Sequence, residues 1–343
     1  MQAVILVGGE GTRLRPLTST VPKPVIPLVD RPFMAYMLEW LRGHGVDDVV
    51  MSLGFLAGGV RDVLGDGSRY GVRLRYVEEP RPLGTGGAVK YAESLLDERF
   101  LMLNGDVLTD LDLTAQLALH EAKGARGTLA LVPVEDPSNY GLVRLEPDGA
   151  VREFVEKPSP EQIDTNLISA GAYVLEREVL APVPPDRPVS IEREVFPRLV
   201  GDGLYGYAGS GYWLDIGTPA RYLQATFDIL EGRVETGPVQ RLGPGARVAD
   251  GARVGDLAVL GHDVRVGPRG EVDRAVVLGG STLAEDCRVT DSVVGPGCEI
   301  GARTRIEGGA VLGEGVTVGA DNVIGAGARI FPGVSLPDGA ISF

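Results

Sequence analysis

The first two thirds of the chain show two hydrophobic patterns that alternate. Short apolar runs rich in β-branched residues predict buried strands, and segments with apolar residues at helical spacing predict helices. Strands are expected at 2–7, 47–53, 73–79, 100–103, 128–134 and 166–175, and helices at 31–42, 60–64, 85–96, 113–123, 191–200 and 219–231. This alternation predicts an α/β fold, an open and mainly parallel sheet with helices on both faces. Residues 140–158 instead predict a hairpin that turns at Asp148 and Gly149.

Aliphatic residues in the C-terminal part of the chain recur at every sixth position. A period of six fits neither a helix nor a long strand, and it is typical of a hexapeptide β-helix, in which one aliphatic residue per short strand points inward. The phase slips at 279–293, where we expect a bulged or looped-out coil. The fifteen in-phase residues are Leu242, Val248, Val254, Leu260, Val266, Val272, Leu278, Val294, Ile300, Ile306, Leu312, Val318, Ile324, Ile330 and Leu336.

The first predicted strand ends in a glycine-rich loop, Gly8-Gly9-Glu10-Gly11-Thr12. Such a loop presents backbone N–H groups to anions, usually phosphates. It contains neither G-x-G-x-x-G nor a closing Gly-Lys-Ser/Thr, so it is neither a dinucleotide fingerprint nor a P-loop. The cations Arg13, Arg15 and Lys23 follow it, and they suit a triphosphate.

Three candidate residues lie at the carboxyl ends of predicted strands. Gly8 follows strand 2–7, Glu79 ends strand 73–79, and Asp106 lies just beyond strand 100–103. In parallel sheets, ligands gather at the carboxyl ends of the strands. We therefore expect the site at this edge.

Composition and charge limit the number of domains, the classes of binding partner and the cellular compartment that we expect. The 343 residues are enough for two domains, which we place at 1–235 and 236–343. A net charge of −14 argues against a nucleic-acid surface, and no apolar run approaches the ~20 residues of a membrane span. The chain starts with a core strand, so we expect no signal peptide. Cys287 and Cys298, without a C-x-x-C, fit a reducing cytoplasm and small buried apolar positions.

Several segments together resemble one enzyme family. The string G-G-x-G-T-R-L-x-P-L-T followed by P-K-P resembles the signature of sugar-1-phosphate nucleotidyltransferases. L-G-T-G-G, L-N-G-D-V-L, N-L-I-S-A-G, S-I-E-R-E-V-F-P and the ending P-D-G-A-I-S-F are similar to bacterial mannose-1-phosphate guanylyltransferases with a β-helix tail. L-G-T-G-G also occurs in heptose-phosphate guanylyltransferases. The resemblance implies a Rossmann-like catalytic domain followed by a left-handed parallel β-helix. It also implies the reaction of GTP with mannose 1-phosphate to give GDP-mannose and pyrophosphate, with Mg²⁺.

The resemblance also implies a role for each motif residue. Arg13, Lys23 and Lys157 match catalytic cations, and Asp106 and Asp215 match the carboxylates that bind Mg²⁺. Two acids so far apart cannot be paired by spacing, so their pairing rests on the resemblance. The implied nucleotide-binding residues are Leu6, Gly8, Gly9, Gly11, Thr12, Arg13, Glu79, Gly84, Thr85 and Asp106. The implied sugar-phosphate-binding residues are Asn104, Gly141, Glu156, Lys157, Asn166, Gly171 and Glu192.

Glu79 bears on which base is bound. Relatives that use uridine or thymidine nucleotides often have glutamine there, whose amide can both accept from N3–H and donate to O4 of a pyrimidine. A carboxylate only accepts hydrogen bonds, and guanine offers adjacent N1–H and N2–H donors. Glu79 therefore favours guanine.

Other functions stay open from the sequence. The same chemistry could use dTTP or UTP with glucose 1-phosphate, or GTP with a heptose 1-phosphate. The chain could also be a regulatory subunit that has lost catalysis. Acyl transfer by the β-helix would need a base, and the repeats offer only His262, which we expect to be a solvated turn residue. The β-helix is instead expected to form a homo-oligomer or to dock on the catalytic domain.

Overall fold

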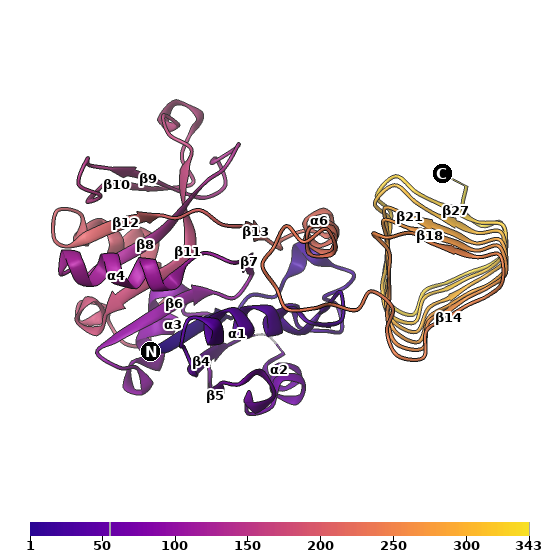
Figure 1. The fold of residues 1–343 in the computed structure, drawn as a ribbon, viewed down its shortest axis with the longest axis horizontal. Helices are drawn as coiled ribbons and strands as arrows, with labels where there is room; N and C mark the ends of the chain where they lie inside the picture. The colour runs from indigo at the N-terminus through magenta and orange to yellow at the C-terminus, as the bar shows by residue number, and fades with distance from the viewer. Residues whose placement is uncertain (55, 343) are drawn as a thin grey trace. The chain divides into compact units, whose positions relative to one another are not determined.

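The computed structural model describes residues 1–54 and 56–342 (Figure 1). Its residues form two compact units, Met1–Gly9 with Met37–Trp213, and Glu10–Tyr36 with Leu214–Phe343. This division differs from the boundary expected at residues 235 and 236, which stays a prediction. No helix among the described residues is long and apolar enough to cross a membrane.

The first unit is built on a nine-stranded sheet. Its main path runs in the order β10-β9-β11-β6-β1-β4-β5, and β8 joins β11 to β12. The strands are β1 Gln2–Val7, β4 Asp48–Leu53, β5 Arg73–Glu78, β6 Arg99–Asn104, β8 Gly127–Pro133, β9 Gly141–Leu145, β10 Val151–Glu156, β11 Leu167–Glu176 and β12 Leu204–Ala208. Two further short strands are β7 (Val107–Thr109) and β13 (Trp213–Asp215).

The expectation of a mainly parallel sheet is correct for half of it. Strands β6, β1, β4 and β5 are parallel, but β11 runs antiparallel to β6, β8 and β9. Parallel neighbours need a long crossover, usually a helix. Between β8 and β11 the chain makes only the predicted β9–β10 hairpin and a short 3-10 helix, Pro160–Gln162, so these strands reverse direction.

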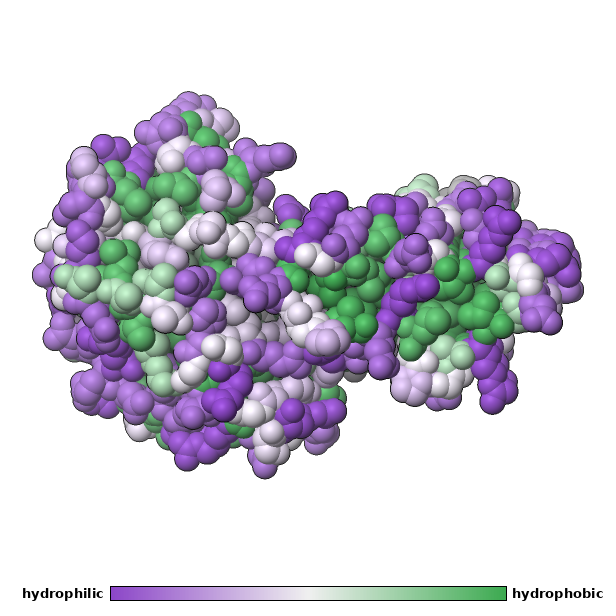
Figure 2. Space-filling model, in the orientation of Figure 1, coloured by the Kyte–Doolittle hydropathy of each residue, from purple (hydrophilic) through white to green (hydrophobic). Residues whose placement is uncertain are grey.

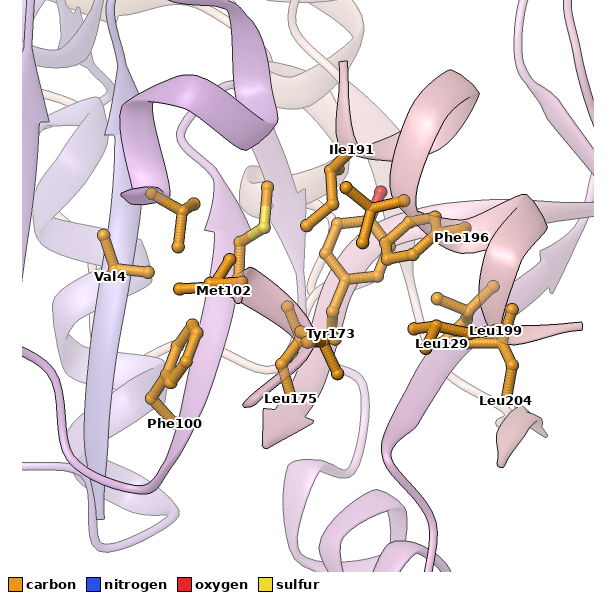
Figure 3. Close-up of a cluster of buried hydrophobic side chains, with 14 of the residues drawn as sticks. Val4, Phe100, Met102, Leu129, Tyr173, Leu175, Ile191, Phe196, Leu199 and Leu204 are labelled. Carbon is orange, nitrogen blue, oxygen red and sulfur yellow. The ribbon is translucent and has the colours of Figure 1, made fainter. Parts of the chain in front are cut away.

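The helices lie close to their predicted positions. They are α1 Phe33–Gly43, α2 Ala57–Leu64, α3 Gly84–Ala92, α4 Leu113–Lys123, α5 Phe196–Leu199 and α6 Pro219–Leu230. The helix expected at 85–96 ends earlier, in the 3-10 turn Glu93–Leu95, and the one expected at 191–200 begins as a π-helix, Ile191–Val195. Figure 3 shows Tyr173 and Phe196 in the hydrophobic core of the first unit. Their ring centroids are 5.0 Å apart.

The second unit contains the β-helix. Two-residue and three-residue strands stack in parallel into three sheets of six, five and five strands, which appear in Figure 1 as the sides of a triangular coil. This confirms the predicted fold class. The strands are β14 Arg247–Val248, β15 Arg253–Val254, β16 Val259–Leu260, β17 Arg265–Val266, β18 Glu271–Asp273, β19 Val276–Val277, β20 Thr282–Leu283, β21 Arg288–Thr290, β22 Val293–Val294, β23 Glu299–Ile300, β24 Arg305–Ile306, β25 Val311–Leu312, β26 Thr317–Val318, β27 Val323–Ile324, β28 Arg329–Ile330 and β29 Ser335–Leu336.

The looped-out coil expected at 279–293 is wrong. Strands β20 and β21 fill this segment, and the phase changes because two corners are each one residue shorter, from Val272 to Val277 and from Val289 to Val294. Val277, rather than Leu278, pairs with Leu260 and joins the inner core. Two single-residue deletions at corners leave the stacking intact, but they look like one larger break in the linear spacing.

The expected burial of both cysteines and the expected exposure of His262 are confirmed. Cys287 and Cys298 are free thiols buried in the β-helix core, and burial raises the pKa of Cys298 to about 11. The His262 side chain is 70% exposed and lies 3.1 Å from the carboxylate of its neighbour Asp263.

Contacts within the second unit tie the β-helix to the segments that precede it. The Arg274 guanidinium, at the first shortened corner, lies 4.6 Å from the ring centroid of Phe227 on α6. The Gln240 N–H donates to Asp30 at 2.8 Å. Figure 2 shows apolar areas on the β-helix among its hydrophilic side chains, and Leu242 and Val248 of the first coil are each 42% exposed.

Candidate active site

The end of β1 approaches its neighbours closely. Gly8 follows β1 and lies close to Glu79, which follows β5. A Cβ on Gly8 would lie 3.2 Å from Glu79 Oε1. A Cβ on Gly54, which follows β4, would lie 2.7 Å from the Gly8 carbonyl oxygen. Gly8, Glu79 and Asp106 follow the ends of β1, β5 and β6, as the sequence predicts. Here glycine serves the approach of one backbone to another.

Glu79 is held at this edge by two hydrogen bonds. Its Oε1 accepts from Ser52 Oγ at 3.1 Å, and its Oε2 accepts from the Leu83 N–H at 3.0 Å. A carboxylate offers about four lone-pair sites, so acceptor capacity is left for a ligand. Glu79 also fixes the loop that leads into α3, a role that the sequence did not indicate.

The L-G-T-G-G motif packs against the segment before the π-helix. The N–H groups of Gly86 and Gly87 donate to the Val189 carbonyl at 2.9 and 3.2 Å. A Cβ on Gly84, which has a φ of +69°, would lie 2.7 Å from that oxygen. Thr85 Oγ1 donates to Glu192 Oε2 at 2.6 Å. This hydrogen bond links Thr85, expected to bind the nucleotide, to Glu192, expected to bind the sugar phosphate.

Asn104 and Gly171 lie together beside a bulge in β11. The register against β8 shifts between Ser169 and Tyr173, and Gly171 there has a φ of +73°. A Cβ on Gly171 would lie 2.8 Å from Asn104 Nδ2. Trp213 Nε1 donates to the Ala170 carbonyl at 2.8 Å and fixes the bulge.

Three of the predicted acids lie close enough to the buried Tyr173 for their charges to affect it. Burial first, and then the negative charges of Glu192, Glu156 and Asp106, raise the pKa of Tyr173. The Tyr173 hydroxyl accepts from Ser169 Oγ at 3.0 Å. The structure thus gathers Asp106 after β6, Glu156 on β10 and Glu192 on the π-helix. The sequence predicted β11 only as a strand of the core and gave no sign that these acids lie near Tyr173.

Glu156 carries a perturbed carboxyl group. Burial raises its pKa, the nearby charge of Glu192 raises it further, and Lys157 and Arg193 partly oppose both effects. Gly141 pairs with Glu156 across the hairpin, and a Cβ there would lie 3.2 Å from Glu156 Oε2.

Lys157 and Asn166 stand at the exposed rim of the first unit. Lys157 has a positive φ of 54°, and its N–H donates to the Tyr140 carbonyl at 2.9 Å. Asn166 accepts the Val134 N–H at 3.0 Å with its backbone oxygen. Both residues are exposed, and their ligand contacts stay predictions.

In the second unit, the glycine-rich loop folds onto a lysine. Gly11 has a φ of +61° and precedes the 3-10 helix Thr12–Leu14. Its carbonyl accepts from Thr18 Oγ1 at 2.7 Å, and a Cβ on Gly11 would lie 3.3 Å from the Lys23 Cβ. Thr18, in the L-T of the motif, is therefore a supporting residue that sequence reasoning did not single out.

Arg13 and Asp215 meet at Gly217. A Cβ on Gly217 would lie 2.9 Å from Arg13 Nη2 and 3.2 Å from Asp215 Oδ2. A glycine two residues after Asp215 therefore leaves room for the guanidinium. By contrast, Arg15 lies 3.4 Å from the exposed Glu10, which suits a surface ion pair.

The carboxylates suit a magnesium ion chemically. Asp106 and Asp215 are partly exposed acids at the ends of strands. Among residues 1–54 and 56–342 there is no group of three or more His, Cys, Asp or Glu side chains that could hold a metal. Mg²⁺ usually takes one or two carboxylates and completes its shell with phosphate oxygens and water. The donor set therefore fits, although the pairing of these two acids stays a prediction.

Comparison with known proteins identifies the class. The family model described as nucleotidyl transferase matches residues 2–232, and the model described as GMPPB C-terminal domain matches residues 237–340. The chain therefore belongs to the nucleotidyl transferase family. Members of this family generally use a divalent metal ion.

Individual relatives narrow the class. The chain is 38% identical to the mannose-1-phosphate guanylyltransferase of Mycobacterium tuberculosis, over 92% of this chain and 80% of that protein. It is 34% identical to the UTP–glucose-1-phosphate uridylyltransferase of Synechocystis, over 88% and 80%. The crystal structure of HddC from Yersinia pseudotuberculosis complexed with GMP-PN matches with a TM-score of 0.57 and 28% identity, covering 66% of this chain and 99% of that one. The chain is an enzyme, a sugar-1-phosphate nucleotidyltransferase similar to mannose-1-phosphate guanylyltransferases.

Proposed function

We propose that the enzyme transfers a guanylyl group from GTP to mannose 1-phosphate, which gives GDP-mannose and pyrophosphate. The observation that carries the choice of guanine is Glu79, a carboxylate beside Gly8 that keeps acceptor capacity after binding Ser52 and Leu83. The identity to the mycobacterial guanylyltransferase supports the choice of sugar. We also propose a cytoplasmic location, supported by two free buried thiols.

The mechanism follows from the charges of the site residues. A sugar phosphate oxygen attacks the α-phosphorus of the nucleotide in line; the new P–O bond forms as the bond to the β-phosphate oxygen breaks, and pyrophosphate leaves. Such transfer depends mainly on positioning and charge stabilisation. Arg13 holds pyrophosphate oxygens through its planar guanidinium, Lys23 neutralises the α-phosphate, and Lys157 reaches the sugar phosphate.

The remaining residues orient the two substrates. Backbone N–H groups of Gly8, Gly9, Gly11 and Thr12 cradle the phosphates beside Leu6. Glu156, Glu192 and Asn166 bind sugar hydroxyls, while Asn104, Gly141 and Gly171 shape that side of the site. Asp106 and Asp215 would hold Mg²⁺, which, when bound, would neutralise phosphate charge and ease the departure of pyrophosphate.

A pyrophosphate-release assay over GTP, dTTP, UTP and ATP, each with mannose, glucose and heptose 1-phosphates, tests the proposal. We expect the highest kcat/KM with GTP and mannose 1-phosphate. Exclusive turnover of dTTP or UTP would refute the guanine assignment and support glucose-1-phosphate chemistry, which the Synechocystis relative makes the second candidate.

In Glu79→Gln, we expect kcat/KM for GTP to fall at least about tenfold relative to kcat/KM for UTP, because the amide no longer offers two acceptors.

The metal assignment predicts that Asp106→Asn and Asp215→Asn each lower kcat by about 100-fold or more at moderate Mg²⁺, since each substitution removes one anionic ligand. Steady-state rates over a Mg²⁺ series measure this effect. Asp62→Asn, at an exposed aspartate on α2, serves as the matched control. Near-normal rates in both site variants would refute the metal site.

A further inference from the structure

A pocket of the first unit lies apart from the residues assigned to catalysis. Its volume is about 170 Å³, and its walls come from Arg126 and from segment 179–202. This volume exceeds the roughly 10–15 Å³ that one water needs, but it is below the ~300–1,000 Å³ of sites for drug-sized ligands. A ligand of this pocket must therefore be small.

The pocket combines an apolar wall with a cation. Val179, Val183 and Leu199 line it with buried aliphatic side chains. Arg198 lies at the same pocket and is exposed. Within residues 1–54 and 56–342 its guanidinium has no ion pair or hydrogen bond.

The other arginines of the pocket are already neutralised. Arg126 donates to Glu178 at 2.7 Å and also pairs with Asp202. Arg187 donates to Glu194 Oε2 at 2.6 Å. Arg198 is thus the cation that a ligand can use at little cost, because binding it breaks no existing ion pair.

We propose that this pocket binds a small organic anion, with its anionic group on Arg198 and a short apolar body on Val179, Val183 and Leu199. An Arg–carboxylate pair can form two parallel hydrogen bonds, and burial of the apolar body adds a hydrophobic contribution. A short aliphatic acid suits the small volume of the pocket.

The pocket is connected to the sugar side of the active site, and this part of the inference rests on the proposed function. Glu194, a pocket residue, accepts the Ser190 N–H with Oε1 at 3.3 Å. Ser190 Oγ in turn donates to Glu192 Oε2 at 2.7 Å. The negative charge of a ligand on Arg198 repels the Glu194 carboxylate in the same pocket and weakens its hydrogen bond with Ser190. The ligand therefore loosens Ser190 and Glu192, and it raises KM for the sugar 1-phosphate.

Calorimetric titration of the full chain tests binding independently of turnover. The probes are isovalerate, isovaleramide, which has the same shape without charge, and inorganic phosphate, which has charge without an apolar body. We expect saturable binding of isovalerate and at least about tenfold weaker binding of the other two. No saturable binding of isovalerate, or equal binding of isovaleramide, overturns the proposal.

Variants locate the site. Arg198→Ala should weaken isovalerate binding at least about tenfold, Arg198→Lys should weaken it less, and Arg152→Ala, an exposed arginine on β10 outside the pocket, should leave it unchanged. Equal affinity in Arg198→Ala and the wild type, with both chains folded by circular dichroism, overturns the assignment.

The kinetic effect is tested separately. Saturating isovalerate should raise KM for the sugar 1-phosphate about fivefold in the wild type and not in Arg198→Ala. Glu194→Gln should bind isovalerate while its KM no longer responds, because the link to Ser190 is weakened. An unchanged KM in the wild type overturns the regulatory role. Turnover without isovalerate reports on the proposed function, so the two failures are distinguishable.

Discussion

At the scale of single residues, the site depends on carboxylates whose environments differ. Glu79 is fixed by two donors, whereas Glu156 is half-buried and faces a second acid, Glu192. Burial of a carboxylate raises the free energy of its ionised form, and a nearby negative charge raises it further. The fold therefore disfavours the ionised form of Glu156. Carboxyl groups with a perturbed pKa are typical of sites that bind a polar ligand.

The raised pKa of Glu156 gives a prediction for stability. A carboxyl group with a raised pKa binds its proton more tightly in the folded state, so its ionisation destabilises the fold above the folded pKa and has no effect below the ordinary value of 4.5. Glu156→Gln should therefore raise Tm at neutral pH, and the gain should vanish as pH falls toward 4.5. The kcat/KM of Glu156→Gln for the sugar 1-phosphate should fall about tenfold or more, because the amide is a weaker acceptor for sugar hydroxyls than the carboxylate.

Glu161→Gln is the control with the opposite sign. A hydrogen bond from Ser159 lowers the pKa of Glu161, so its ionised form stabilises the fold at neutral pH and that contribution is lost in acid. Its substitution should leave Tm unchanged or lower it at neutral pH. Thermal unfolding across a pH series measures both variants. A Tm gain of equal size in both would contradict the account given for Glu156.

At the scale of elements, α3 shows that a motif can serve packing before it serves a ligand. The sequence indicated the L-G-T-G-G segment through a resemblance alone. In the structure, the first turn of α3 donates N–H groups to Val189, and the absence of side chains lets segment 187–191 lie against the helix. Linear spacing could not predict this contact, because about a hundred residues separate its two sides.

This packing predicts a cost for one methyl group. A Cβ on Gly87 would lie 2.7 Å from the Arg187 carbonyl oxygen, so Gly87→Ala should lower the free energy of unfolding by about 1–3 kcal/mol. Gly58→Ala lies in α2, where no atom of the described residues is within 4 Å of the added Cβ, and it should instead raise this free energy by about 0.5–1 kcal/mol. Urea unfolding compares the two. Equal effects would show that helix propensity, rather than the contact, decides.

At the scale of the whole molecule, the β-helix still needs a role. Its core is continuous from coil to coil, but Leu242 and Val248 of the first coil are partly exposed apolar residues. Stacked repeats commonly protect such an end by capping or association. The contacts of Arg274 and Gln240 account for one attachment within the second unit. Assembly into a homo-oligomer stays a prediction.

Removal of residues 239–343 tests this role. We expect the full chain to have the mass of an oligomer by light scattering, and the shortened chain to have a smaller number of subunits, because the β-helix supplies the interface. Asp106→Asn in the full chain is the control, since it should alter turnover and not mass. A full chain that is already monomeric would contradict the prediction.

The amino-acid sequence was enough to predict the two kinds of fold, most helix and strand positions, and the residues at the strand ends. These follow from local periodicity and turn chemistry, which act over a few residues. Tertiary structure decided the antiparallel half of the sheet, the two shortened corners of the β-helix, and the gathering of Asp106, Glu156 and Glu192 around Tyr173. These features depend on contacts between residues far apart in the chain, whose direction and distance no local pattern encodes.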